Sequence, residues 1–142
     1  MKKNILLLII LLFSITGNSQ SIIGKWKTID DETGKEKSII EIYQVKGKIY
    51  AKVDELLTKG DENKICENCE GANKNKPIKG MMIINGLTKD GDEWNGAKIL
   101  DPKTGNEYKC YITLEEPNKL KVRGYLGFAL LGRTQYWYKV TQ

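Results

Sequence analysis

The strongest constraint on the fold is a series of eight short segments in which apolar and polar residues alternate. Alternation with a period of two is typical of strands that bury one face and expose the other. Turn sequences containing glycine separate several segments, among them Asp30–Gly34 and Asp101–Gly105. The segments are Lys25–Ile29, Lys37–Val45, Lys48–Val53, Lys79–Ile84, Trp94–Leu100, Glu107–Leu114, Lys119–Leu126 and Arg133–Val140. Beyond the N-terminal segment no apolar pattern keeps helical spacing over three turns, so we expect an antiparallel all-β protein.

Eight short strands joined by tight reversals, without crossover helices, fit an up-and-down barrel better than a sandwich. Closure of the sheet also removes the exposed edges that an open sheet must otherwise protect. The chain of 142 residues fits one such domain. We therefore predict an eight-stranded antiparallel up-and-down barrel formed by residues 20–142.

The alternation also predicts which side chains face the interior. Charged residues fall on the other face in most strands, which leaves an uncharged inner set: Trp26, Ile40, Ile42, Ile49, Ala51, Val53, Met82, Ile84, Ala97, Ile99, Tyr108, Cys110, Ile112, Leu114, Leu120 and Val122. Both faces of the last strand are mixed, so its inner face stays open. An eight-stranded barrel is either filled by its own side chains or holds one small ligand. If a ligand binds, we expect it between Ile42, Val53, Met82 and Tyr108.

The N-terminus has the features of a secretory signal peptide. Lys2 and Lys3 precede an apolar run of nine residues, Ile5–Phe13, and small or polar residues follow up to Ser19. A retained membrane anchor is the weaker interpretation, because a helix needs about 20 apolar residues to cross a bilayer. We expect residues 1–19 to be removed, with cleavage after Ser19 or Gln20, and the protein to reach the periplasm or the extracellular space. No later segment is apolar enough to span a membrane.

Export changes the interpretation of the three cysteines, because disulfides persist outside the cytoplasm. Cys66 and Cys69 form a C-x-x-C pair in a polar and acidic stretch, and we expect them to form a structural disulfide. A redox-active pair is less favoured because acidic neighbours raise a thiol pKa. A zinc site is also less favoured because its other ligands would have to be carboxylates or Cys110. Cys110 lies in an alternating strand and is predicted to be a small buried thiol.

The composition argues against catalysis and against nucleic-acid binding. The chain has no histidine, which excludes imidazole as a catalytic base or metal ligand. Its paired carboxylates lie at predicted reversals, where solvated acids are usual. The net charge of +5 comes from lysines spread along the chain, with two arginines, and export would separate the protein from nucleic acid. We therefore expect no enzymatic activity, no cofactor and no metal.

Two connections have unusual sequences. The stretch Leu57–Pro77 is long for a loop in a compact domain, so it is either a lid over one end of the barrel or a solvated loop. The stretch Gly127–Gly132 is apolar where a polar turn is usual. Exposed, it would mark a contact surface. The favoured alternative is that Phe128 and Leu131 fold inward and plug the closed end beside Trp26.

Gly24-Lys25-Trp26 in the first strand and Gly132-Arg133-Thr134 at the start of the last resemble the lipocalin pattern. In lipocalins a tryptophan of the first strand packs under an arginine of the last strand and closes one end. An arginine over an indole adds a cation–π attraction of roughly 0.5–2 kcal/mol to apolar burial. The resemblance therefore implies that Gly24, Trp26 and Arg133 close one end of a lipocalin-like barrel.

A longer ordered series resembles a bacterial family of exported proteins known as domain of unknown function 2147. The matching residues are Gly24 to Asp31 with Gly34 and Lys35, the Cys66/Cys69 pair, Trp94 with Gly96, Ile99 to Pro102 with Gly105 and Tyr108, Leu120 to Tyr125, and Leu131 to Thr134 with Trp137. The resemblance implies a lipocalin-like barrel without an assigned activity.

Two hypotheses for the function remain. The preferred one is an exported, noncatalytic, monomeric protein that binds a small apolar ligand, such as a lipid fragment, inside the barrel. The alternative is a ligand-free envelope scaffold or protein-interaction module. It would use the Cys66/Cys69 loop or the apolar loop 127–132.

Overall fold

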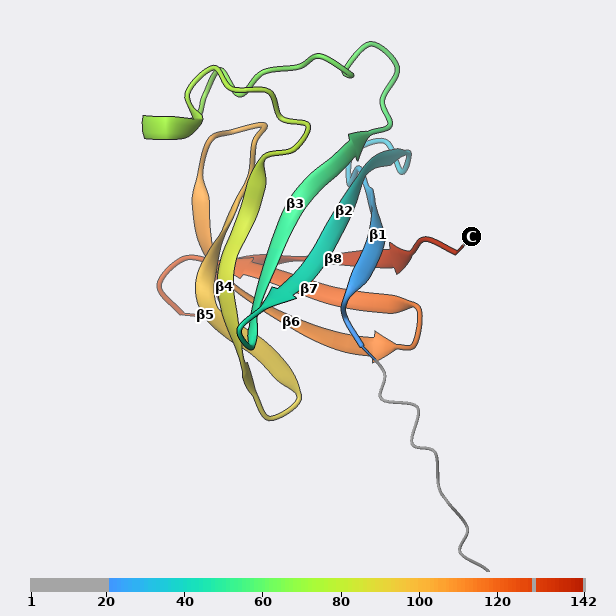
Figure 1. The fold of residues 1–142 in the computed structure, drawn as a ribbon, viewed down its shortest axis with the longest axis vertical. Helices are drawn as coiled ribbons and strands as arrows, with labels where there is room; N and C mark the ends of the chain where they lie inside the picture. The colour runs from blue at the N-terminus through green and yellow to red at the C-terminus, as the bar shows by residue number, and fades with distance from the viewer. Residues whose placement is uncertain (1–20, 129, 142) are drawn as a thin grey trace, which may run out of the picture.

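The computed structural model describes residues 21–128 and 130–141, and this part of the chain forms one closed antiparallel barrel of eight strands (Figure 1). Each strand pairs with the next along the chain, and β1 pairs with β8. The predicted fold class is therefore confirmed, whereas the predicted signal peptide lies outside the described residues. The strands are β1 Gly24–Ile29, β2 Glu36–Val45, β3 Lys48–Leu56, β4 Met82–Asp90, β5 Glu93–Leu100, β6 Glu107–Glu116, β7 Lys119–Tyr125 and β8 Gly132–Lys139, with a 3-10 turn, η1, at Gly71–Asn73.

Strand β4 is the element whose predicted range, Lys79–Ile84, differs most from the structure. The preceding residues form a turn, in which Gly80 N–H donates to Val53 O at 2.7 Å. The pairing of β3 with β4 then shifts between Ala51 and Lys52, and Ile83 and Ile84 are both buried. This irregularity reverses the alternation before Ile84, so Met82 is 41% exposed on the outer surface. The prediction that Met82 faces the interior is therefore wrong.

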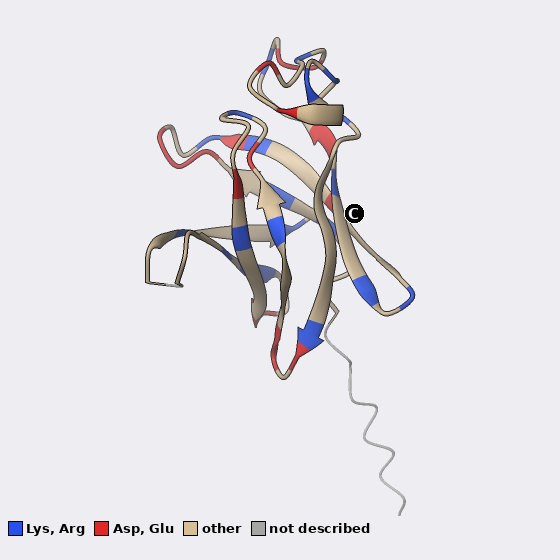
Figure 2. Cartoon of the chain, turned by 90° about the vertical axis from the view of Figure 1, so that its left-hand side faces the viewer, with Lys and Arg blue, Asp and Glu red and all other residues tan. Residues whose placement is uncertain are grey.

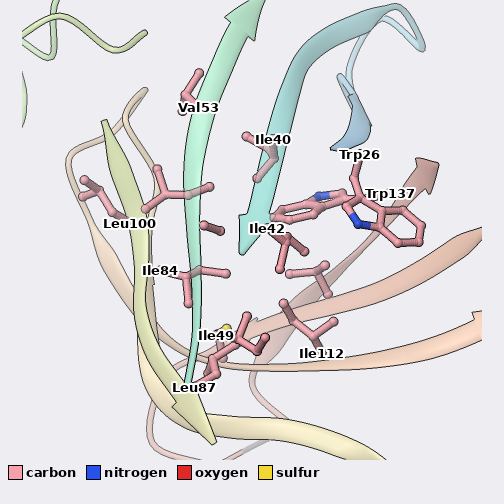
Figure 3. Close-up of a cluster of buried hydrophobic side chains, with 14 of the residues drawn as sticks. Trp26, Ile40, Ile42, Ile49, Val53, Ile84, Leu87, Leu100, Ile112 and Trp137 are labelled. Carbon is pink, nitrogen blue, oxygen red and sulfur yellow. The ribbon is translucent and has the colours of Figure 1, made fainter. Parts of the chain in front are cut away.

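The interior is filled at its centre by a cluster of aliphatic side chains beside two tryptophans (Figure 3). Trp26 from β1 and Trp137 from β8 are both buried. Trp137 fixes the inner face of β8, because Tyr136 and Tyr138 on either side of it are exposed. The other fully buried members include Ile42, Ile49, Ile84, Leu87, Ile112, Leu120 and Cys110. Burial raises the pKa of Cys110 to about 12, so its thiol stays protonated, as expected for a buried structural cysteine.

One end of the barrel is closed by the direct pairing of β1 with β8. In the described chain two residue pairs join these strands, Trp26 with Lys139 and Lys27 with Tyr138. The Trp26 indole N–H donates to Ile22 O at 2.8 Å, and Lys139 Nζ lies 5.5 Å from the ring centroid. Gly24, at the start of β1, lies beside Lys139, because a Cβ there would be 3.9 Å from Lys139 Cε. Lys139 thus has the position over the indole that was predicted for Arg133.

Arg133 lies at the opposite end of β8, so the prediction that it covers Trp26 is wrong. It precedes Lys139 by six residues, about 20 Å along an extended strand. There its guanidinium forms an ion pair with Asp31 of the β1–β2 turn. The reason is topological. In an antiparallel barrel of eight strands β1 starts at the end where β8 finishes, so an early residue of β1 meets a late residue of β8.

The same topology places the four connections that follow odd-numbered strands at one end of the barrel. Figure 1 shows β6, β7 and β8 running across the view while β1, β2 and β3 rise through it. The β7–β8 loop therefore does not reach Trp26, and its side chains are exposed: Phe128 by 59%, Leu130 by 86% and Leu131 by 60%. The expectation of a plug at the closed end is wrong.

Within the described residues, no helix is both long and apolar enough to cross a bilayer.

The two ends predict different responses to truncation. We expect Trp26→Ala to lower the free energy of unfolding by about 3–5 kcal/mol, because it leaves a large void in the core. Arg133→Ala removes an exposed ion pair and is expected to cost about 0–1 kcal/mol. Urea unfolding followed by far-UV circular dichroism measures both changes. Equal losses of unfolding free energy for the two variants would contradict the conclusion that Trp26 packs in the closed end and that Arg133 does not.

Candidate functional site: the open end of the barrel

A cavity of about 520 Å³ opens at the end opposite Lys139. All four connections after odd-numbered strands contribute to it: the β1–β2 turn, the β3–β4 loop, the β5–β6 turn and the β7–β8 loop. Its wall includes Ile40, Val53, Ile83, Ile99, Leu100, Val122 and Trp137, which are apolar, and its rim includes Asp31, Glu32, Lys37, Asp61, Lys64, Asp101, Lys103 and Arg133, which are charged. The cavity therefore combines an apolar interior with a polar entrance.

The cavity lies where β1 and β8 diverge. The described pairing of these strands stops at Lys27 and Tyr138, and the next residues on either side, Thr28 and Trp137, belong to the cavity wall. Thr28 Oγ1 lies 2.6 Å from Ser38 Oγ of β2, so these buried hydroxyls satisfy each other on that wall. The unpaired stretch of the β1–β8 seam thus forms one side of the site.

A line of polar contacts bridges this seam at the entrance. The Trp137 indole N–H donates to Gln135 Oε1 at 3.4 Å, and Gln135 Nε2 donates to Asp31 Oδ2 at 3.3 Å. The Arg133 guanidinium donates to the same carboxylate oxygen. Asp31 therefore connects the β1–β2 turn to β8 through side chains, where the backbones do not pair. Neither Asp31 nor Gln135 was predicted as a site residue. The alternation of Arg133, Gln135 and Trp137 was the sequence signal for Gln135.

Two turns of the same design form part of the rim. In each, an aspartate N–H donates to the residue five positions on and its carbonyl accepts from a glycine N–H, with all four distances 2.8 Å: Asp30 with Lys35 and Gly34, and Asp101 with Asn106 and Gly105. Both glycines have positive φ, 70° and 76°, which side chains with a Cβ adopt at a cost. Lys103 Nζ lies 3.7 Å from Glu32 Oε1, so charges of the two turns meet across the entrance.

The β3–β4 loop packs against the second of these turns. Cys66 and Cys69 form a disulfide, as predicted, and both are buried. Cys66 N–H donates to Lys76 O at 2.8 Å and Asn75 N–H donates to Cys66 O at 2.9 Å, so this part of the loop is a small hairpin. Asn68 Nδ2 donates to Lys103 O at 3.0 Å. The loop is therefore an ordered structure docked on the β5–β6 turn, although most of its residues are exposed.

The structure brings together two of the four side chains that were predicted to contact a ligand. Val53 and Tyr108 both line the cavity. Ile42 is 1% exposed and lies deeper, in the packed cluster of Figure 3, and Met82 is on the outer surface. Space for Tyr108 comes from β7, where a Cβ on Gly124 would lie 3.4 Å from Tyr108 Cβ. Among the described residues no three cysteine or carboxylate side chains come together as a metal-ligand set.

The close approach of the loop predicts a specific effect of Gly105→Ala. The new methyl group would overlap the carbonyl oxygen of Asn68. Gly34→Ala is the matched control, because Gly34 has a similar φ of 70° and nothing within 4 Å of its Cβ position. We expect Gly34→Ala to cost about 1–2 kcal/mol of stability through backbone strain, and Gly105→Ala about 1–3 kcal/mol more.

Urea unfolding measures the difference between these variants, and hydrogen exchange locates it. Backbone amides of residues 57–81 should exchange faster in Gly105→Ala and at the wild-type rate in Gly34→Ala. Similar exchange in this segment for both variants would show that the loop does not depend on contact with Gly105.

The rim also predicts an acid-sensitive contribution from Asp30. The N–H of Thr33 above all, at 2.8 Å from Oδ1, and also its hydroxyl and the N–H of Glu32, hold the pKa of Asp30 below its ordinary value. A lowered pKa means that the ionised carboxylate stabilises the fold. This stabilisation is complete above the unfolded-state pKa of about 3.9 and is lost as the pH falls through the folded-state value. Urea midpoints between pH 6 and pH 2 should fall less steeply for Asp30→Asn than for the wild type, and identical slopes would exclude the contribution.

Comparison with known proteins places the fold and the family. No curated protein matches the sequence. The solved structure of protein HP1028 from the human pathogen Helicobacter pylori, described as belonging to the lipocalin family, superposes with a TM-score of 0.75 and 19% identity. The match covers 86% of this chain and 84% of that one. At this identity the likeness shows a lipocalin-like fold. A family model described as "Uncharacterized protein conserved in bacteria (DUF2147)" matches residues 24–139, and the chain belongs to this bacterial family.

Proposed function

We propose that this protein binds one small, mainly apolar molecule in the open end of the barrel. The observation that carries the proposal is the cavity of about 520 Å³, which falls in the range of roughly 300–1,000 Å³ typical of small-molecule sites. A barrel filled by its own side chains, the structural alternative, would leave no space of this size. The lipocalin-like fold supports a binding role as well.

The arrangement of the wall favours a ligand with one polar end. Its apolar part would lie against Ile40, Val53 and Val122, and against the ring of Trp137. Its polar end would lie near Gln135, whose amide already bridges Trp137 and Asp31. A ligand hydroxyl or carbonyl could exchange hydrogen bonds with this amide at little cost, because the partners at 3.3 Å and 3.4 Å are long contacts. A lipid fragment with a short chain has this chemistry.

The proposed role is noncatalytic, exported and monomeric. Residues 1–19 act as a signal peptide in this proposal, which the Cys66–Cys69 disulfide supports because such bonds persist outside the cytoplasm. The chain has no histidine, and the thiol of Cys110 is buried and protonated. The charged groups near the cavity lie at its rim, where Asp31 pairs with Arg133 and Glu32 pairs with Lys103.

Filling the cavity tests the proposal. The probe is N-phenyl-1-naphthylamine, a small apolar dye that becomes fluorescent in an apolar site. We expect Val53→Phe, which adds a ring at the cavity wall, to weaken dye binding at least tenfold. Val45→Phe is the matched control, because Val45 is exposed at the far end of β2. Native mass spectrometry of protein purified from the envelope of its own cells should, in addition, show the mass of a copurified ligand.

The outcomes separate binding from a structural role. Overpacking of the cavity wall costs about 1–3 kcal/mol, so a loss of dye binding by Val53→Phe is interpreted only if the variant is folded. Thermal unfolding of each variant therefore accompanies the titration. Dye binding that survives in a folded Val53→Phe variant would place the dye outside the cavity. No dye binding and no added mass in the wild type would contradict the proposal and favour a scaffold without a ligand.

A further inference from the structure

The β7–β8 loop carries an apolar tip formed by Leu126, Phe128, Leu130 and Leu131. These side chains are exposed by 60%, 59%, 86% and 60%. The loop is a defined turn, because Leu126 N–H donates to Leu131 O at 2.9 Å and Leu131 N–H donates to Phe128 O at 3.0 Å. Figure 2 shows it as the uncharged loop that projects from the barrel at the left. The backbone therefore holds four large apolar side chains in water, which is unfavourable unless something covers them.

All charged residues of the two strands that carry this tip are basic. After Glu116 the sequence has five basic residues, Lys119, Lys121, Arg123, Arg133 and Lys139, and no acidic one. Arg123 braces the tip itself, since its guanidinium donates to Leu130 O at 3.4 Å and to Thr134 Oγ1 at 2.7 Å. An apolar tip next to basic residues is complementary to a surface with an apolar interior and a negatively charged exterior.

Tyrosines on the outer face of the same hairpin are a second feature that is typical of surfaces in contact with lipid headgroups. Tyr136 and Tyr138 of β8 are 41% and 43% exposed, and Lys119 Nζ lies 4.5 Å from the centroid of the Tyr136 ring. Tyrosine is enriched where membrane proteins meet the headgroup layer, because its ring is apolar and its hydroxyl is polar. The hairpin thus presents, in order, an apolar tip, arginines, and a lysine–tyrosine face.

We propose that the apolar tip docks the protein on a bilayer that contains anionic lipids. Phe128 and Leu130 enter the boundary between headgroups and acyl chains, and the basic residues at the tip end of the two strands, Arg123 and Arg133, lie on the side of the lipid phosphates. A protein partner fits less well, because a stable interface buries about 800 Å² on each side, and a convex loop of six residues presents far less area. The tip is also continuous with the cavity, since Leu126 and Leu131 line both. Docking therefore places the cavity entrance against the lipid.

Vesicle cosedimentation tests this docking independently of any cavity ligand. The protein is purified from the cell envelope, and the vesicles contain phosphatidylglycerol and phosphatidylethanolamine or, for comparison, phosphatidylcholine alone. We expect the wild type to bind the anionic vesicles, and the double variant Phe128→Ser/Leu130→Ser to bind at least tenfold more weakly. Val45→Ser, which removes an exposed apolar side chain far from the tip, should bind like the wild type. The variant Arg133→Gln, which removes a positive charge beside the tip, should lose affinity for anionic vesicles more than for neutral ones.

A second measurement reports the insertion directly. In a Phe128→Trp variant, lipids brominated on the acyl chains should quench the added fluorescence, because the indole would lie within reach of the chains. Absence of quenching, or equal vesicle binding by the wild type and the Phe128→Ser/Leu130→Ser variant, would overturn the proposal. Release of a stoichiometric protein partner by that variant, without vesicle binding by the wild type, would also overturn it in favour of a protein contact. Dye binding in the cavity should be unchanged in the double variant, so failure of docking and failure of ligand binding remain distinguishable.

Discussion

The organisation of this barrel depends on how its first and last strands meet. Two described residue pairs join β1 to β8, at Trp26 and Lys27, and the buried Trp26 ring fills the barrel behind them. Where those backbone pairs stop, the next residues of the two strands, Thr28 and Trp137, line the cavity. One end is consequently a packed core, and the other end is a cavity of about 520 Å³. A seam paired along its whole length would bring these walls together and leave less room between them.

At the open end side chains link the first turn to the last strand, whereas at the closed end backbone pairing links the first and last strands. Asp31 accepts hydrogen bonds from Arg133 and Gln135 and so links the first turn to the last strand without closing the gap. The two matching aspartate–glycine turns set the rim, and the ordered β3–β4 loop rests on one of them through Asn68 and Lys103. The entrance is therefore defined by polar contacts that water can reach, whereas the closed end is defined by apolar packing.

Much of this could be predicted from the sequence, for reasons that particular residues make clear. Alternation identified the barrel and the inward position of Trp26, Ile40, Val53 and Cys110, because a buried face with a period of two leaves a direct trace in the residue order. Met82 was assigned wrongly because an irregularity in strand pairing leaves no such trace. Arg133 was assigned wrongly because it lies at the start of the last strand, whereas the antiparallel order brings the end of that strand to Trp26. The presence and position of the cavity could not be predicted, because they depend on where two distant strands stop pairing.

The position of Cys110 has a consequence for the chemistry of the three cysteines. An odd thiol can attack a disulfide and exchange partners, but the attack requires a thiolate that reaches the sulfur in line. Cys110 is turned into the barrel, with a pKa of about 12, while the Cys66–Cys69 bond belongs to the loop docked at the rim. Once the sheet has closed, the fold itself works as a protecting group. The Cys66–Cys69 pairing is then preserved for as long as the barrel stays intact.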